Sequence, residues 1–439
     1  MPKQAAPGSS TADRQELADG GQPGLAVLSS SPVTRWPEAA RRTLPPRVAY
    51  ALAAAVIGLG LFASVTPSPL YHSYSVLWHF SPLTLTLIYA TYAFGVLATL
   101  LLAGRVSDEV GRRPVLLAAL GVLMASSVLF MVANATAWLF IARALQGLAT
   151  GAALSTGSAA LLDLHPRRDA AKVGLANGVA SAGGLGLGFL VSSALVQLGS
   201  APRVLPYLVL LVLFAAAFAG AYWMPEPVPE RSSFRLTPQR PSVPAEIRHP
   251  FLLASLGVIG SWSLGGLFFS LGPALSAQLF RTSNVIIAGI GAVALALSAA
   301  LSQVIFHRTA PWVGATAGSA TLAAGTILIV AAAVTGSSAA YITGSVVGGA
   351  GFGVAFLGGL RQLVAVIPPQ HRAAVMSAFY IVAYASLSVP AVIAGIVVTH
   401  LGLQETFEIF GSIVAGIALV MALEAWRTRP DRLPPVRSA

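Results

Sequence analysis

The sequence predicts an all-α membrane protein with twelve transmembrane helices, arranged as two pseudo-symmetric bundles of six. Of its 439 residues, 56% are hydrophobic and only 9% are charged, whereas a soluble protein carries about a quarter charged residues. The mean hydropathy is +0.77. The charges are confined to short blocks between long apolar runs, which is the pattern of a polytopic membrane protein.

Twelve apolar runs each have about 20 residues, enough to cross a hydrocarbon core of roughly 30 Å. Because backbone in lipid must satisfy its own hydrogen bonds, each run is predicted to be a helix. The predicted spans are 48–67, 82–103, 114–134, 137–162, 172–197, 204–224, 251–275, 284–306, 311–334, 338–364, 373–399 and 405–426.

The distribution of Lys and Arg predicts the orientation. The loops after the even-numbered spans, together with both tails, hold nearly all of these residues, and the opposite loops hold only Arg203 and Arg281. Positive residues favour the cytoplasmic side, so both termini are predicted to be cytoplasmic, as an even number of spans requires. We expect a multi-pass protein of the cell membrane.

The domain organisation follows from composition. The N-terminal tail is rich in Gly, Ser, Pro and Ala, which is typical of disorder, and a Pro-rich basic segment divides the spans six and six. The predicted divisions are an N-terminal tail at 1–46, a first bundle at 47–224, a cytoplasmic linker at 225–250, a second bundle at 251–426 and a C-terminal tail at 427–439.

Composition also excludes several functions. The net charge is +11, but the basic residues are dispersed over many loops, so we interpret them as a topological bias and expect no nucleic-acid partner. Cysteine is absent, which excludes thiolate metal sites and cysteine nucleophiles. The sequence has no HExxH and no Walker A motif. We therefore expect no metal, no cofactor and no enzymatic activity.

The two predicted bundles share faint self-similarity, in a consistent order and at offsets of 202 to 206 residues. Such repeats are typical of secondary carriers, whose substrate site lies near the membrane midplane between the halves. The matched glycines have the spacing that allows close helix packing. The matches are LFASVTP at 61–67 with LFFSLGP at 267–273, Gly147 and Gly151 with Gly349 and Gly353, and PRRDAA at 166–171 with PQHRAA at 369–374.

The loop between the second and third spans, GRVSDEVGRRP, resembles the signature of the major facilitator superfamily. Glu109 departs from that signature, which usually has Arg there. A second stretch, FIARALQGLATGAA in the fourth span, resembles the RxxQGxxxG motif of the same family. The matching positions are Gly104, Asp108, Gly111, Arg112 and Arg113 in the loop, and Arg143, Gln146, Gly147 and Gly151 in the span.

A third family motif, the GPxxGG of antiporters, is degraded in the fifth span. GLGLGFL at 184–190 keeps Gly184 and Gly188 but has Leu185 where proline is expected. The resemblance, which covers about 48–426, implies the fold of the family and points to its drug/proton antiporter-like branch.

The resemblance implies a gating role for the charged loop. Asp108 would face the N-terminal end of the eleventh span, near 373–376, only while the cytoplasmic side is closed, because a carboxylate is favoured at a helix N-terminus. Arg112 would pair with Asp163 at the inner end of the fourth span. The alternative is a solvated loop whose charges only fix the topology.

Arg143 is a basic residue well inside an apolar span. A charge there costs at least about 2.5 kcal/mol, so it should face a cavity or a partner and not lipid. Gln146 and Thr150 follow it on one helix face. The resemblance implies that Arg143 lines the cavity and takes part in proton coupling or substrate orientation; the alternative is that it snorkels to the outer surface.

No Asp or Glu lies near the middle of any predicted span, although proton-coupled carriers commonly use such a carboxylate. The remaining cavity candidates are aromatic or neutral polar residues, a set that suits amphiphilic or aromatic compounds. They are Tyr89, Tyr92, Asn177, Ser181, Trp262, Ser263, Gln303, Tyr380 and Tyr384.

The function predicted from the sequence is secondary active transport by alternating access, most concretely proton-linked efflux of lipophilic or aromatic compounds. An importer or facilitator of the same family is the first alternative, and a membrane receptor or membrane-embedded enzyme is a more distant one. The expected partners are a small-molecule substrate, protons and the lipid bilayer, and we expect a monomer.

Overall fold

The computed structural model describes residues 43–102, 106–227, 241–368 and 371–429. Within these ranges every regular element is helical. Twelve helices or helix runs are long and apolar enough to cross a membrane, with mean hydropathies between 1.3 and 2.5. The predicted all-α, twelve-span fold is therefore confirmed, and each described span overlaps its predicted counterpart.

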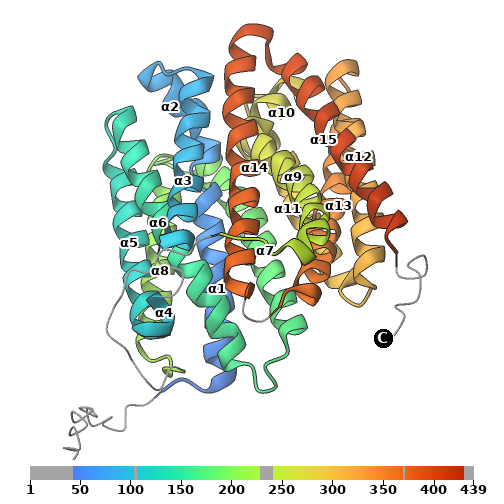
Figure 1. Cartoon of the computed structure of the whole chain (residues 1–439). Coiled ribbons are helices and arrows are strands. Elements are labelled where there is room, and N and C mark those ends of the chain that lie inside the picture. Colours follow the sequence, from blue (N-terminus) through green and yellow to red (C-terminus); the bar gives the residue numbers. More distant parts are fainter. Residues whose placement is uncertain (1–42, 103–105, 228–240, 369–370, 430–439) are drawn as a thin grey trace, which may run out of the picture. The chain divides into compact units, whose positions relative to one another are not determined.

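The first half of the chain forms six spans, coloured blue to green in Figure 1. The first span is a composite of α1, a 3-10 turn η1 and α2. The elements are α1 Pro46–Val65, η1 Ser68–Leu70, α2 Tyr71–Trp78, α3 Pro82–Leu102, the short α4 Val106–Glu109, α5 Arg112–Val132, α6 Thr136–Leu164, α7 Ala170–Leu198 and α8 Leu205–Tyr222.

The second half forms the other six spans, coloured yellow to red in Figure 1. The elements are η2 Ala245–Ile247, α9 Arg248–Ser270, α10 Gly272–Phe280, α11 Val285–Phe306, α12 Pro311–Thr335, α13 Ser338–Val366, α14 Arg372–Leu401 and α15 Leu403–Arg427.

Two short helices were not foreseen from the sequence. The predicted first span ended at residue 67, but the helical run continues through η1 and α2 to Trp78. The predicted seventh span, 251–275, crosses the boundary between α9 and α10. In both places a proline lies just after the boundary, and proline starts a new helical turn well because it needs no N–H partner there.

The repeat is visible in matched structural details. The short helices α2 and α10 both end at a residue with left-handed backbone, His79 (φ 51°) and Arg281 (φ 49°), which are 202 residues apart. Non-glycine residues rarely adopt this conformation, so its recurrence at one offset supports a common architecture for the two halves.

The glycine pairs pack their helices at matched places. A Cβ on Gly147 would meet the Tyr92 carbonyl of α3, and a Cβ on Gly349 would meet the Leu295 carbonyl of α11. Gly151 and Gly353 lie in the same way against the Val96 and Ala299 carbonyls. The predicted packing role is therefore consistent with the structure: α6 lies on α3 as α13 lies on α11.

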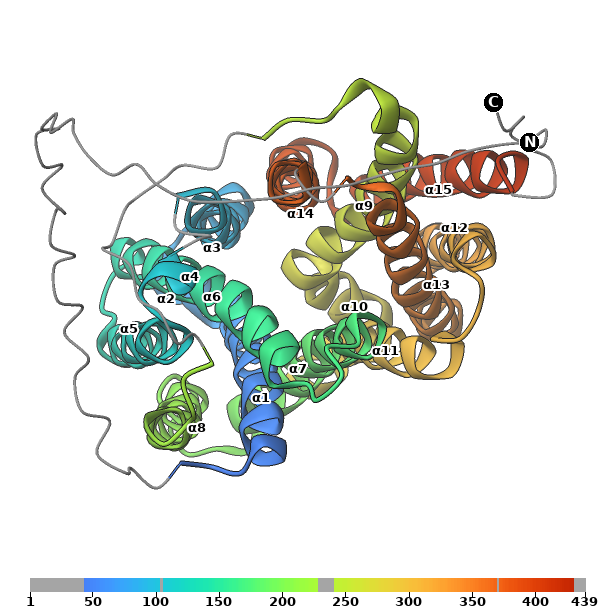
Figure 2. The ribbon, with the colours of Figure 1, turned by 60° about the horizontal axis from the view of Figure 1, so that its bottom comes forward.

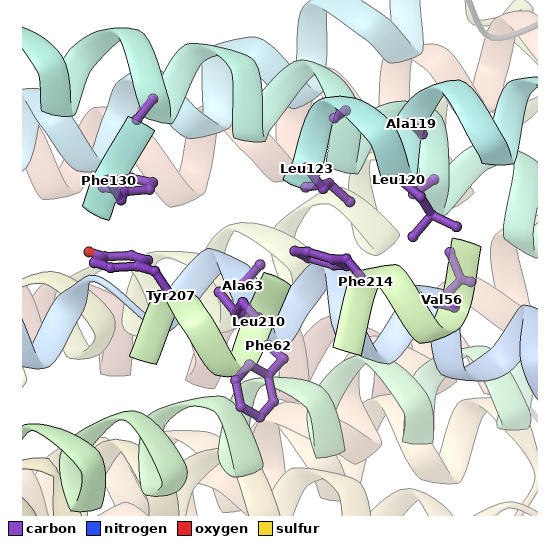
Figure 3. Packing of buried hydrophobic residues seen from close by; sticks show 14 of the residues in the cluster. Val56, Phe62, Ala63, Ala119, Leu120, Leu123, Phe130, Tyr207, Leu210 and Phe214 are labelled. Atoms are coloured by element: carbon purple, nitrogen blue, oxygen red, sulfur yellow. The ribbon is translucent and has the colours of Figure 1, made fainter. Parts of the chain in front are cut away.

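A hydrophobic core holds the first bundle together. The Phe130 ring of α5 stacks on the Tyr207 ring of α8 with centroids 4.7 Å apart, and Leu210 and Phe214 continue the contact along α8 toward Leu120 (Figure 3). The side chains are fully or almost fully buried. This core packs the helices of the first bundle together, and α3 and α7 lie at its interface with the other half.

The two halves meet along two helix pairs, α3 with α14 and α7 with α11 (Figure 2). A Cβ on Gly395 of α14 would touch the Thr86 side chain of α3. On the other pair, the Gln197 side-chain oxygen accepts a hydrogen bond of 2.8 Å from the Val285 N–H. Because α3 and α11 occupy equivalent places in the repeat, the two pairs are related by the internal pseudo-symmetry.

Candidate functional site

The first described span begins and the last one ends on the same side of the molecule, because the number of spans is even. We call this the inner side and the opposite one the outer side. The bundles are packed together toward the outer side, where Phe189 of α7 and Phe269 of α9 have ring centroids 6.2 Å apart and Thr86 lies against Gly395.

Arg112 organises the inner loop between α3 and α5. Its Nε donates to the Asp163 Oδ2 at 3.1 Å, so the predicted ion pair is present. Its Nη1 donates to the Ser107 hydroxyl at 2.7 Å and also pairs with Asp108. The Arg112 side chain is only 11% exposed, which makes this more than a solvated surface pair.

Glu226, just beyond α8, completes the loop and was not foreseen. Its two carboxylate oxygens accept hydrogen bonds from the backbone N–H groups of Arg112 (2.8 Å) and Arg113 (3.0 Å). A carboxylate at this helix start satisfies donors that otherwise lack intrahelical partners. The sequence signal for this role is an acidic residue two positions after the predicted sixth span, within the predicted linker.

Gly111 is required at the start of α5. Its φ is 109°, and a Cβ would collide with the Glu226 carboxylate. Only glycine combines this backbone conformation with such close approach. Arg113 lies with its guanidinium 5.0 Å from the centre of the Tyr222 ring. Gly104, the other glycine of the motif, lies outside the described residues.

Asp108 is the more exposed partner of Arg112 in the loop. Its side chain is 57% exposed and pairs with Arg112. Among the described residues it makes no hydrogen bond to α14, whose N-terminal end was expected to receive it. The expected contact belongs to a state with a closed inner side, whereas the packing described above joins the bundles toward the outer side.

Arg143 lies in the centre of the first bundle and is fully buried. Its Nη1 donates to the Ser64 carbonyl at 2.6 Å and to the Gln146 Oε1 at 2.7 Å, and its Nε donates to the Tyr71 hydroxyl at 2.9 Å. The burial excludes snorkelling to the surface in this structure. It also means that Arg143 does not itself line an open cavity here.

Arg143 and Gln146 together stabilise the end of α1. The Gln146 Nε2 donates to the Ala63 carbonyl at 3.0 Å, next to the Ser64 carbonyl that Arg143 binds. Carbonyls at a helix C-terminus lack intrahelical donors. The motif thus supplies donors where α1 gives way to η1.

Three tyrosine rings surround the Arg143 guanidinium. Its carbon lies 5.6 Å from the ring centre of Tyr71, 6.0 Å from that of Tyr89 and 5.4 Å from that of Tyr92. The negative faces of aromatic rings attract a cation. Among the described residues no carboxylate pairs with Arg143, so neutral groups alone offset its charge.

A junction patch of aromatic and aliphatic side chains lies where α3, α9 and α14 meet. The Trp262 ring meets the Tyr384 ring edge-on at 5.1 Å. Tyr92 is buried in the same cluster, so four of the predicted cavity residues come together here. We define the junction patch as Tyr92, Leu97, Leu100, Trp262, Tyr380, Tyr384 and Leu387.

Several polar atoms near this patch are buried without a hydrogen-bond partner in the described part of the chain. They include the Trp262 Nε1, the Tyr92 hydroxyl and the Thr150 hydroxyl. The Tyr92 hydroxyl lies near Ser64 and Thr150 without hydrogen-bond geometry to either. Unpaired buried polar groups are costly, so they mark a place where a ligand or water can bind.

The other predicted cavity residues are not part of the junction patch. Tyr89 is buried in the outer cluster that spans both halves, and Ser263 is buried in α9. Asn177 donates to the Ser158 hydroxyl at 2.9 Å, and Ser181 donates weakly to Asn177 at 3.5 Å. These two residues contribute a polar stretch to the inner half of α7.

Gln303 lies between the halves on the inner part of α11. A Cβ on Gly178 of α7 would collide with its side-chain oxygen. Gln303 also lines a small hollow between α11, α12 and α13. At the edge of this hollow the Arg361 Nη1 donates to the His307 and Thr309 carbonyls at 3.0 and 3.2 Å, so Arg361 lies near the inner end of α13.

The repeated six-helix bundles, the two interface pairs and the buried junction between them define a polytopic carrier. The sequence matches the family model of the Major Facilitator Superfamily over residues 48–389, and the chain belongs to this family of transporters, whose members are not enzymes.

The structure is similar to the crystal structure of the human organic anion transporter MFSD10 (TETRAN), with a TM-score of 0.63. The likeness covers 87% of this chain and 100% of that one, at 17% sequence identity, a level at which it concerns the fold alone. None of the curated proteins matches the sequence significantly.

Proposed function

We propose that this protein exports lipophilic or aromatic small molecules across the cell membrane by alternating access. The observation that carries the proposal is the junction patch, where aromatic side chains of both halves meet and two of them, Tyr92 and Trp262, carry a buried polar atom without a partner in the described structure. Sites for small molecules combine such apolar walls with a few placed polar groups. In carriers built from repeats the substrate site lies between the halves.

Alternating access requires that the two halves separate on one side while they close on the other. The packing of Phe189 on Phe269 and of Thr86 on Gly395 joins the halves on the outer side, in addition to the contact of Gly178 with Gln303 on the inner part of the α7–α11 pair. Asp108 lies on the inner side, where it pairs with Arg112 and keeps 57% of its side chain exposed, and it would dock on α14 when that side closes. We therefore assign the structure to an inward-facing state, with both termini in the cytoplasm.

The proposal is tested with purified protein in liposomes. An aromatic dye loaded on one side should cross only when the protein is present, and Trp262→Ala should slow its movement at least about fivefold, since a large part of the patch is lost. Trp138→Ala, at an exposed position of α6 away from the patch, is the matched control. Equal rates for the two variants would contradict the placement of the site.

The proton link is tested in the same liposomes. The proposal of proton-coupled export predicts that an imposed pH gradient accelerates substrate movement and that Arg143→Lys changes this response. Transport that ignores the pH gradient would exclude proton antiport and would leave the alternating-access proposal intact. We propose a monomer as the working unit.

A further inference from the structure

We propose that the junction patch selects organic anions, namely aromatic molecules that carry a fixed negative charge. The inference rests on the proposed function and specifies the charge of the substrate. It is carried by the charge balance of the interior, by the position of Arg143 relative to the patch, and by the kind of polar atom that lacks a partner there.

The charge balance of the interior is positive. Arg143 is fully buried, and its hydrogen-bond partners, Tyr71, Ser64 and Gln146, are neutral. The acidic side chain of the same helix, Asp163, lies at its far inner end and pairs with Arg112. Since buried charges are normally paired, a positive interior without its own carboxylate is a binding environment for an anion.

The positive charge lies one aromatic ring away from the patch. The Arg143 guanidinium carbon is 5.4 Å from the centre of the Tyr92 ring, and Tyr92 belongs to the same cluster as Tyr384 and Trp262. In the low dielectric of a protein interior, charges act over such distances far more strongly than in water. A negative group at the patch is attracted by Arg143, and a positive group is repelled.

The unpaired polar atoms favour the same sign. The indole N–H of Trp262 can only donate a hydrogen bond, and it is buried without an acceptor in the described structure. The Tyr92 hydroxyl can donate as well. A carboxylate or sulfonate offers the acceptors that both need, whereas an ammonium group would bring more donors and find no carboxylate.

A charged substrate also supplies a driving force. No Asp or Glu lies in the middle of the spans, so the protein lacks the usual membrane carboxylate for proton binding. An anion that leaves the cell moves with an inside-negative membrane potential, because the potential acts on any net charge that crosses. Export of an anion therefore needs no proton site in the carrier.

The test uses two probes with one ring system and opposite fixed charges, naphthalene-2-sulfonate and (2-naphthyl)trimethylammonium, in liposomes that contain the intact protein. A potassium gradient with valinomycin sets the membrane potential. We expect the sulfonate to cross at least about tenfold faster than the ammonium compound, a ratio that corresponds to about 1.4 kcal/mol of preference. We expect its uptake to rise when the liposome interior is made positive.

Variants connect the preference to the named residues. Trp262→Phe keeps an aromatic ring and removes the N–H donor. This variant should weaken the inhibition of aromatic-dye transport by the sulfonate several-fold, whereas Trp138→Phe should leave that inhibition unchanged. Arg143→Lys should keep the preference for the anion and Arg143→Gln should lose it. If Arg143→Gln does not fold, the transport rates of the two probes and their dependence on membrane potential in the unaltered protein still test the preference for anions.

The outcomes separate the two proposals. If the ammonium compound crosses as fast as the sulfonate or faster, the protein is a carrier and the inference about charge is overturned. If neither probe crosses, the proposed function itself fails, and the inference fails with it. If the sulfonate crosses preferentially but ignores the membrane potential, the preference for anions stands and the proposed driving force is overturned.

Discussion

The helices α6 and α13 occupy equivalent places in the two halves but use different chemistry one turn from their matched glycines. In α6, Arg143 and Gln146 donate hydrogen bonds to α1 carbonyls at the outer break of the first span. At the same offset α13 has Ser345 and Gly348. There the Tyr341 hydroxyl donates to the Gly272 carbonyl at the break between α9 and α10.

This difference distinguishes a structural requirement that both halves share from a charged group that only the first half contains at this place. Both halves need a donor where the composite spans are interrupted, because helix ends leave carbonyls without partners. A neutral tyrosine is sufficient in the second half. The first half uses a buried cation instead, which costs more to bury, and the proposed function would give this charge a role beside the junction patch.

The largest effect is expected where the halves are alike. Gly147→Leu and Gly349→Leu should each prevent assembly of their bundle, because the new side chain would collide with the Tyr92 or Leu295 carbonyl. Gly121→Leu in α5, where a Cβ meets no atom within 4 Å, is the control. Size-exclusion profiles in detergent measure the outcome. A monodisperse, thermally stable Gly147→Leu protein would contradict the repeat packing.

The next effect is expected where the halves differ. Arg143→Leu should lower the free energy of unfolding by about 3 kcal/mol or more, since it leaves the Ser64 carbonyl and the Tyr71 hydroxyl buried without their partner. Ser345→Ala should cost about 1 kcal/mol or less, because the Ser345 hydroxyl only bonds the carbonyl of Tyr341 within its own helix. Thermal unfolding of both variants compares the two halves directly. Equal losses of unfolding free energy would show that Arg143 stabilises α6 no more than Ser345 stabilises α13.

A smaller effect is expected at the inner loop. Glu226→Ala should cost about 1–2 kcal/mol, the usual loss for a helix cap, because the Arg112 and Arg113 N–H groups lose their acceptor. Glu246→Ala, an exposed acidic residue before α9, is the control. Melting temperatures measured at low and high salt report the change. If Glu226→Ala has the same melting temperature as the control variant, Glu226 does not stabilise the loop.

The smallest effect on stability is expected at Asp108, whose side chain is mostly exposed. Asp108→Asn should leave the melting temperature nearly unchanged and should shift the population toward the inward-facing state, because the neutral side chain interacts less with a helix N-terminus. Crosslinking yields across the outer and inner sides measure this ratio. An unchanged ratio together with an unchanged transport rate would show that Asp108 is not a latch.

Much of the fold follows from the sequence, because the bilayer imposes strict rules on length and polarity. The twelve spans could be predicted in this way. The repeat was predicted from matched sequence stretches, and the Arg112–Asp163 pair was implied only by the resemblance to the family. The short helices α2 and α10 could not, because they are too short and too mixed in polarity to stand out next to a span.

The site was less predictable. The candidate residues of the junction patch were found as a set, but the sequence could not show that Trp262 and Tyr384 touch, since their contact depends on how α9 and α14 pack. Glu226 was missed because its role depends on the fold of a loop more than 110 residues away. The burial of Arg143 was equally hidden, as hydropathy does not distinguish a side chain in a bundle core from one beside a cavity.

The central claim is that the two halves must separate on the outer side for each transport cycle. The chain has no native cysteine, so a disulfide can be introduced without further changes by the double variant Thr86→Cys and Gly395→Cys, which joins α3 to α14 where they touch. The account predicts that oxidation stops transport, that reduction restores it, and that neither single variant responds. Full transport with the disulfide completely formed would contradict the account.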